Sequence, residues 1–148
     1  MKSIYQTNFN NQKVLVRVDF NVPLNSEKIV TDNSRIIAAK KTIDKIINDG
    51  GTAILMSHLG RPKGKVVNEL SLKPICKDLE IKLSQNIKLV SKDVKEIDST
   101  DLFVSDDEKI VMLENIRFYP EEERNNQQFA KHLSNLGDIY VKQYGQFN

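Results

Sequence analysis

The sequence is poor in cysteine and in long apolar runs. Its only cysteine, Cys76, cannot form an internal disulfide, which fits a reducing cytoplasm. Cys76 stands in LKPICKDLE at helical spacing from other apolar residues, so we expect a core side chain rather than a reactive thiol. The start of the chain lacks an apolar stretch of signal-peptide length, and no later run approaches the ~20 residues needed to cross a bilayer. A soluble cytoplasmic protein without a membrane partner is therefore expected.

The chain also lacks a strong charge imbalance and the common nucleotide and metal motifs. Its 22 basic residues are interleaved with 20 acidic ones, for a net charge of +2, which argues against a nucleic-acid partner. There is no GxGxxG, no P-loop and no His/Cys cluster at metal-binding spacing. With 148 residues and no internal repeat or linker, the chain has the size of one domain.

What is present is an alternation of strand and helix patterns. Apolar, β-branched runs predict strands over 13–20, 52–57, 86–90, 109–115 and 138–141. Apolar residues at helical spacing predict helices over 33–51, 71–80 and 125–137, with Asn33 or Ser34 capping the first and Gly50 ending it. Residues 91–105 fit a short helix plus a loop. This order predicts an α/β fold with a parallel sheet covered by helices on both faces.

Polar side chains appear where the first predicted strand ends. Val14, Val16, Val18 and Phe20 occupy alternate positions, and Arg17, Asp19 and Asn21 lie between or after them. Polar groups on a strand buried on both faces are costly unless they are paired or face a ligand. An internal Arg17–Asp19 network and a ligand site explain this pattern equally well.

Basic side chains follow two further strands. SHLGRPKG delivers His58 and Arg61, and ENIRF delivers Arg117. Each loop taken singly would more often be solvated surface, but the carboxyl ends of parallel strands share one edge of a sheet. Arginine presents a fork of donors that matches carboxylate and phosphate oxygens. Together the loops predict a site for a small, multiply charged anion.

Arg35 adds to this pattern because it falls in the first turn of the first predicted helix. A cation is mildly unfavourable beside the exposed N–H groups there, and an anion would turn that penalty into an attraction. Two alternatives are that Arg35 projects into water or meets Asp32.

Other charged residues are expected to have structural or solvated roles. The acidic run PEEER, residues 120–124, suits the start of a helix, where negative charge is favourable. We expect His132 to be exposed among its polar neighbours. Lys63 and Lys65 are expected to be solvated loop residues.

Five stretches resemble the amino-terminal half of the phosphoglycerate kinase family. They are VLVRVDFNVPL, DNSRI, SHLGRPKG, LENIRFYPEEE and FAKHLSNLGDIYV, which occur in the family's order and approximate spacing from about Tyr5 to Val141. The resemblance implies a Rossmann-like parallel sheet with helices on both faces. It also implies that residues 1–148 form a partial amino-terminal substrate-binding domain without the nucleotide-binding domain.

The resemblance implies a role for each candidate residue. Asp19 and Asn21 would hold the hydroxyl and polar end of 3-phosphoglycerate, supported by Arg17, while His58, Arg61 and Arg117 would cradle the non-transferred phosphate. Arg35 would contact the substrate carboxylate and act as the catalytic residue by stabilising the phosphoryl group during its transfer. The implied substrate-binding set is Arg17, Asp19, Phe20, Asn21, Arg35, His58, Leu59, Gly60, Arg61 and Arg117.

The end of the chain departs from the family. After GDIYV the family continues with an Asn-Asp-Ala-Phe-Gly stretch and later a His-Arg-Ala-His stretch, where this chain reads KQYGQFN. The implied protein is a glycolytic phosphoglycerate kinase, which moves a phosphoryl group between 1,3-bisphosphoglycerate and ADP. It is expected here as a truncated monomer that is inactive on its own. Mg-ATP or Mg-ADP would be bound by the absent domain, and no cofactor or metal is expected on this chain. The alternatives are a non-catalytic phospho-acid-binding module and a degenerate product that does not fold stably.

Overall fold

The computed structural model describes residues 4–103 and 107–142, and its centre is a parallel sheet of five strands. The strands are β1 (Lys13–Arg17), β2 (Thr52–Met56), β3 (Lys88–Val90), β4 (Ile110–Leu113) and β5 (Ile139–Lys142). Their order across the sheet is β3-β4-β2-β1-β5, and every neighbouring pair is parallel. The predicted parallel sheet is confirmed.

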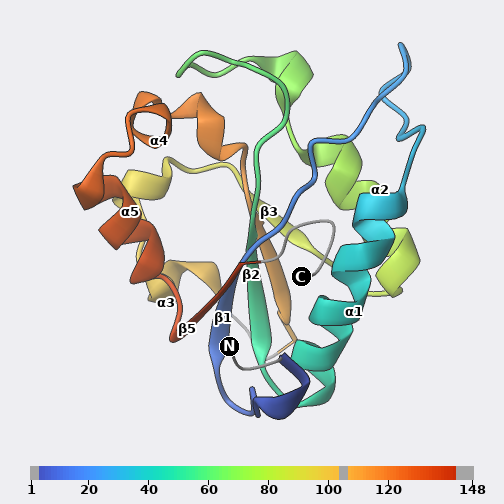
Figure 1. Ribbon diagram of the computed structural model, residues 1–148, viewed down its shortest axis with the longest axis vertical. Helices are drawn as coiled ribbons and strands as arrows, with labels where there is room; N and C mark the ends of the chain where they lie inside the picture. Colours follow the sequence, from blue (N-terminus) through green and yellow to red (C-terminus); the bar gives the residue numbers. More distant parts are fainter. Residues whose placement is uncertain (1–3, 104–106, 143–148) are drawn as a thin grey trace.

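Helices cover both faces of this sheet (Figure 1). One face carries α1 (Ser34–Asn48) and α2 (Lys73–Leu83). The other carries α3 (Ser99–Leu102), α4 (Pro120–Glu123) and α5 (Gln127–Ser134). Short 3-10 turns stand in the connections: η1 (Ile4–Gln6), η2 (Asn68–Leu70), η3 (Val94–Glu96) and η4 (Ile116–Phe118). The α/β fold class with helices on both faces is thus also confirmed.

The two faces of the sheet bury two separate apolar clusters. Val14 and Val16 of β1 join the cluster under α1 and α2, while Leu15 between them joins the cluster under α5. Side chains alternate between the faces of a strand, so both sets of positions must be apolar when both faces are covered. This requirement explains why the strands read as nearly unbroken apolar runs.

Helix α1 ends where its sequence predicts. Gly50 has a φ of 93° and donates to the carbonyl of Ile47 at 3.0 Å, and Gly51 donates to that of Ile46 at 2.9 Å. These two bonds form a Schellman motif, which needs a left-handed residue and therefore favours glycine. The prediction that Gly50 ends the helix is confirmed.

The start of α1 differs from its prediction in one detail. Asn33 occupies the N-cap position, but neither it nor Ser34 makes a side-chain cap bond there. Asp32 instead accepts from the backbone N–H of Ser34 at 3.0 Å. The capping acceptor is therefore displaced by one residue from the predicted pair.

Several predicted segments are longer than the observed strands. Val18 still donates to the carbonyl of Met56 at 3.0 Å, but the N–H of Phe20 donates to Oγ of Ser57 at 2.9 Å. A side chain thus replaces the regular ladder, and β1 ends at Arg17 instead of residue 20. Within 91–105, η3 and α3 form, and residues 104–105 lie outside the described ranges.

In the described part of the chain, every helix is too short or too polar to pass through a lipid bilayer.

We expect Ile46→Ala to lower the free energy of unfolding by about 2 to 5 kcal/mol, because it leaves a cavity under α1. Ile46 is fully buried in the larger cluster, near the end of α1 opposite to Ser34. Urea denaturation followed by circular dichroism measures the change. Lys41→Ala is the control, since Lys41 is exposed on the same helix and should stay within about 0.5 kcal/mol of wild type. Equal stability of the two variants would contradict the assigned core.

Candidate anion-binding site

Three segments meet at the carboxyl ends of the neighbouring strands β1, β2 and β4. The β1 segment is joined to the β2 segment by the bond from Phe20 N–H to Ser57 Oγ. The carbonyl of Ser57 accepts from the N–H of Ile116 at 3.1 Å, and Asn21 Oδ1 accepts from the N–H of Gly60 at 3.0 Å. The structure therefore brings the predicted site segments together at one edge of the sheet, in the upper half of Figure 1.

His58 is half-buried and lies within the electrostatic reach of two guanidinium groups. Burial lowers the pKa of His58, and the positive charges of Arg117 and Arg17 lower it further. Asp19 and Glu122 act in the opposite direction but do not cancel these effects. The cationic form of a half-buried imidazole is disfavoured beside other cations. An anion arriving at this place would favour the protonated ring.

Arg17 has a partner that the sequence reasoning missed. Its guanidinium forms an ion pair of 2.9 Å with Glu122 of α4, and both side chains are largely buried. In the structure Arg17 pairs with Glu122, and Asp19, its partner in the alternative network, pairs with Arg35. PEEER was expected to be only structural, yet one of its acids lies at the edge of the site. Its signal in the sequence is weak: Glu122 follows Arg117 by five residues, with Pro120 between them to start a new helix.

Arg35 reaches across from α1 to the end of β1. Its Nη1 donates to the carbonyl of Asn21 at 2.6 Å and to Oδ1 of Asp19 at 3.2 Å. The Arg35 side chain is also 46% exposed, and after the hydrogen bonds from Ser34 its charge helps to lower the pKa of Asp32. The two alternatives predicted for Arg35, a position in water and a meeting with Asp32, therefore each hold in part. The three candidate residues Asp19, Asn21 and Arg35 are also joined to each other.

The other two arginines predicted for the site, Arg61 and Arg117, have unmet hydrogen-bonding capacity. Nε of Arg117 is buried and has no hydrogen-bond partner, and within 4–103 and 107–142 the exposed Arg61 has no ion pair or side-chain hydrogen bond. A buried donor without an acceptor is costly. Lys63 and Lys65, farther along the same loop, are exposed as expected.

Phe20, Leu59 and Gly60 contribute shape to this edge. The side chains of Phe20 and Leu59 lie in the larger apolar cluster, so only their backbones can face a ligand. Gly60 has a φ of 63°, and a Cβ atom there would lie 2.7 Å from Cδ2 of Leu70. Glycine at this position adopts the positive φ without strain and lets the loop lie close to Leu70.

Two further predictions can be compared with the structure. Cys76 is buried, and burial raises the pKa of its thiol to about 11, so the predicted core role is confirmed. The prediction of an exposed His132 is wrong. His132 is half-buried, and its Nε2 lies 2.7 Å from the carbonyl of Val94, because α5 packs against η3.

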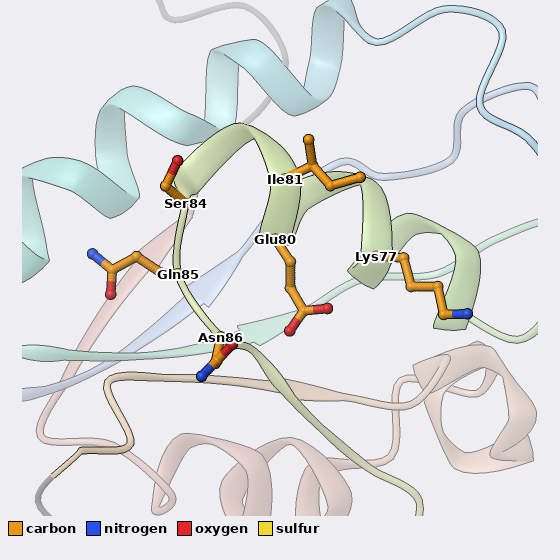
Figure 2. A pocket seen from close by; sticks show the side chains of 6 residues that line it. All are labelled: Lys77, Glu80, Ile81, Ser84, Gln85 and Asn86. Atoms are coloured by element: carbon orange, nitrogen blue, oxygen red, sulfur yellow. The ribbon is translucent and has the colours of Figure 1, made fainter.

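A surface hollow away from this edge has a single basic side chain, Lys77, in its lining. This hollow of about 470 Å³ lies at the end of α2, and the six side chains that line it point in different directions (Figure 2). Its carboxylate, Glu80, already accepts from the N–H of Ile87 at 2.8 Å. Within the described ranges, no group of three or more His, Cys, Asp or Glu residues is arranged to hold a metal ion.

Comparison with known proteins identifies the family. The family profile described as phosphoglycerate kinase matches residues 4–144. The phosphoglycerate kinases of Chlorobium phaeobacteroides strain BS1 and Moorella thermoacetica are 47% and 49% identical to the chain over 140 and 133 residues, which is 95% and 89% of it. These matches cover 35% and 33% of the relatives, so the chain spans about a third of their length.

Solved structures agree with the assignment. Phosphoglycerate kinase from Coxiella burnetii superposes with a TM-score of 0.80 at 33% identity, over 93% of this chain and 34% of that one. The enzyme from Pyrococcus horikoshii OT3 gives 0.81 at 24% identity, over 97% and 36%, and supports the fold alone. The architecture is that of a Rossmann-like α/β protein. The chain belongs to the phosphoglycerate kinase family.

We expect His58 to titrate below its ordinary pKa of 6.5, and Arg117→Ala to raise that pKa because it removes a nearby positive charge. Inorganic phosphate should raise the pKa of His58 in the unaltered chain. Proton NMR of the imidazole signals across a pH series measures both effects. Arg124→Ala removes the same charge from an exposed position on the end of α4 and serves as the control. Equal pKa values in the two variants would contradict the proximity of Arg117.

Proposed function

We propose that this chain supplies the 3-phosphoglycerate half of a phosphoglycerate kinase active site. The reaction is phosphoryl transfer between 1,3-bisphosphoglycerate and ADP in glycolysis. The observation that carries the proposal is the gathering of basic segments at the carboxyl ends of β1, β2 and β4, where His58 lies in the field of two guanidiniums. An anion with both a carboxylate and a phosphate complements such an edge.

The proposed roles divide the site in two. His58, Arg61 and Arg117 bind the phosphate that is not transferred, with support from the incompletely bonded guanidinium of Arg117. Asp19 and Asn21, backed by Arg17, bind the hydroxyl and polar end of the substrate. The backbones of Phe20, Leu59 and Gly60 complete the wall.

Arg35 is the proposed catalytic residue. Its present bonds go to Asp19 and to the carbonyl of Asn21, and its side chain is 46% exposed. We propose that it moves from these acceptors to the substrate carboxylate and to the phosphoryl group in transit. Phosphoryl transfer depends mainly on positioning and on neutralising the charge of the moving oxygens, which a guanidinium can do.

Mg-ATP or Mg-ADP is the proposed nucleotide of the reaction. We propose that the nucleotide binds in a part of the family fold that this chain does not cover. In this view residues 1–148 form an amino-terminal substrate-binding domain of a cytoplasmic glycolytic enzyme, and they bind substrate as a monomer.

Calorimetric titration of the chain with 3-phosphoglycerate tests the binding half of the proposal. Arg61→Ala and Arg117→Ala should each weaken binding by about 1.5 to 3 kcal/mol, or about 10- to 150-fold, because each removes charge-assisted hydrogen bonds. Arg124→Ala, exposed on the end of α4, should bind as the unaltered chain does. Failure of the unaltered chain to bind 3-phosphoglycerate would overturn the proposal.

A coupled assay with ATP, magnesium and 3-phosphoglycerate tests the catalytic half. We expect the chain alone to give no turnover above background, because the proposed site holds no phosphoryl donor. A chain that binds 3-phosphoglycerate without turnover matches the proposal. Turnover that disappears in Arg35→Ala would show that this chain also binds the nucleotide.

A further inference from the structure

We infer that Asn115 is a positioning residue that fixes His58, Arg61 and Arg117 relative to one another. The inference rests on the proposed function, since it concerns the same anion site. Asn115 is the second residue after β4 and is fully buried. The Asn115 side chain has no part in the substrate-binding roles proposed for the site.

The Asn115 amide binds both basic segments at once. Its Nδ2 donates to the carbonyls of Leu59 and Leu70, each at 2.9 Å, and its Oδ1 accepts from the N–H of Arg117 at 3.0 Å. An amide has two N–H donors and a carbonyl acceptor, so both donors and the acceptor are engaged. Leu59 separates His58 from Gly60 and Arg61, and the amide therefore joins the β2 loop to the turn that carries Arg117.

The loop between β2 and α2 needs this support. Its short turn η2 apart, residues 57–72 make no regular backbone structure. Gly60 and Gly64 both adopt positive φ, and the N–H of Gly64 donates to the carbonyl of Arg117 at 3.3 Å. A loop without ladder bonds keeps its shape only through such individual contacts.

The neighbouring carboxylate fixes the far end of the same loop. Glu114 Oε1 accepts from the N–H of Leu72 at 2.8 Å, and its Oε2 accepts from Oγ of Ser71 at 2.7 Å. Glu114 therefore ties the start of α2, whereas Asn115 ties the part that carries the basic side chains. Glu114 Oε1 also accepts from the N–H of Asn115 at 2.8 Å, so the two residues hold the loop together.

Like charges make the positioning role necessary. In addition to burial, the positive charges of Arg117 and Arg17 both lower the pKa of His58. Cations this close to one another repel, so the backbone must hold them in place. An arrangement held before the ligand arrives avoids the cost of ordering it on binding. In catalysis, the misplacement of a group by about 1 Å can lower the reaction rate about 100-fold.

Asn115→Ala, compared with Ile46→Ala as a matched destabilised control, tests the inference. Ile46 is buried under α1, close to Gly51 and away from the basic segments. We expect Asn115→Ala to weaken 3-phosphoglycerate binding about 10- to 100-fold, and Ile46→Ala to leave it within about twofold. Both variants are measured in sucrose, which favours the folded state. If Asn115→Ala still does not fold, Asn115→Ser replaces it, because its hydroxyl retains one donor.

A second measurement does not depend on the substrate. The chain has only two histidines, so the imidazole signal of His58 can be told apart from that of His132 on α5. In Asn115→Ala, faster amide exchange at Leu59 to Gly64 and a rise in the pKa of His58 are expected, because the loop moves away from Arg117. Neither change is expected in Ile46→Ala.

The two measurements separate the possible failures. If the unaltered chain does not bind 3-phosphoglycerate, the proposed function is overturned. The amide exchange and the His58 titration then decide the role of Asn115 by themselves. If loop exchange and the pKa of His58 respond equally to both substitutions, or if Asn115→Ala binds 3-phosphoglycerate as tightly as Ile46→Ala, the inference is overturned.

Discussion

The parallel pairing of β2 with β1 on one side and β4 on the other is the constraint on which the site depends. Because all three strands run in the same direction, their following segments must leave at one edge. That geometry brings cations together although they repel one another. The apolar clusters on both faces supply the stability that makes this crowding tolerable, since Val14 on one face and Ile54 and Val111 on the other are completely buried.

The cations at this edge fall into two electrostatic groups. Arg17 and Arg35 already have carboxylate partners, Glu122 and Asp19. His58 and Arg117 are less well balanced, since the pKa of His58 is lowered and Nε of Arg117 lacks an acceptor. An anion can join the second group without breaking an ion pair, whereas the first group must exchange one partner for another. In the proposed function, this difference suits His58 and Arg117 to the phosphate that is not transferred, and it suits Arg35 to a change of partner.

Sequence patterns predicted the sheet and the convergence of basic segments, because both follow from local periodicity and strand direction. Val14 and Leu15 reveal a strand buried on both faces without knowledge of its neighbours. The pair between Arg17 and Glu122 was not predictable in the same way. It depends on how the short helix α4 folds back over the sheet edge, and no local repeat encodes that path. His132 was misjudged for the same reason, since its burial depends on where η3 lies.

Binding residues on loops pose a general problem that this fold answers with buried polar side chains. The strands hold one another through ladder bonds, but a loop that carries cations has no ladder and also suffers repulsion within itself. Ser57 and Asn115 are among the few buried polar residues in the described ranges, and both bond across segments at the sheet edge. Burial protects these bonds from competition with water, and each replaces a backbone contact that the sheet can no longer provide. Polar residues immediately after buried strands therefore merit the same scrutiny as the charged ones that follow them, because they determine where the charges lie.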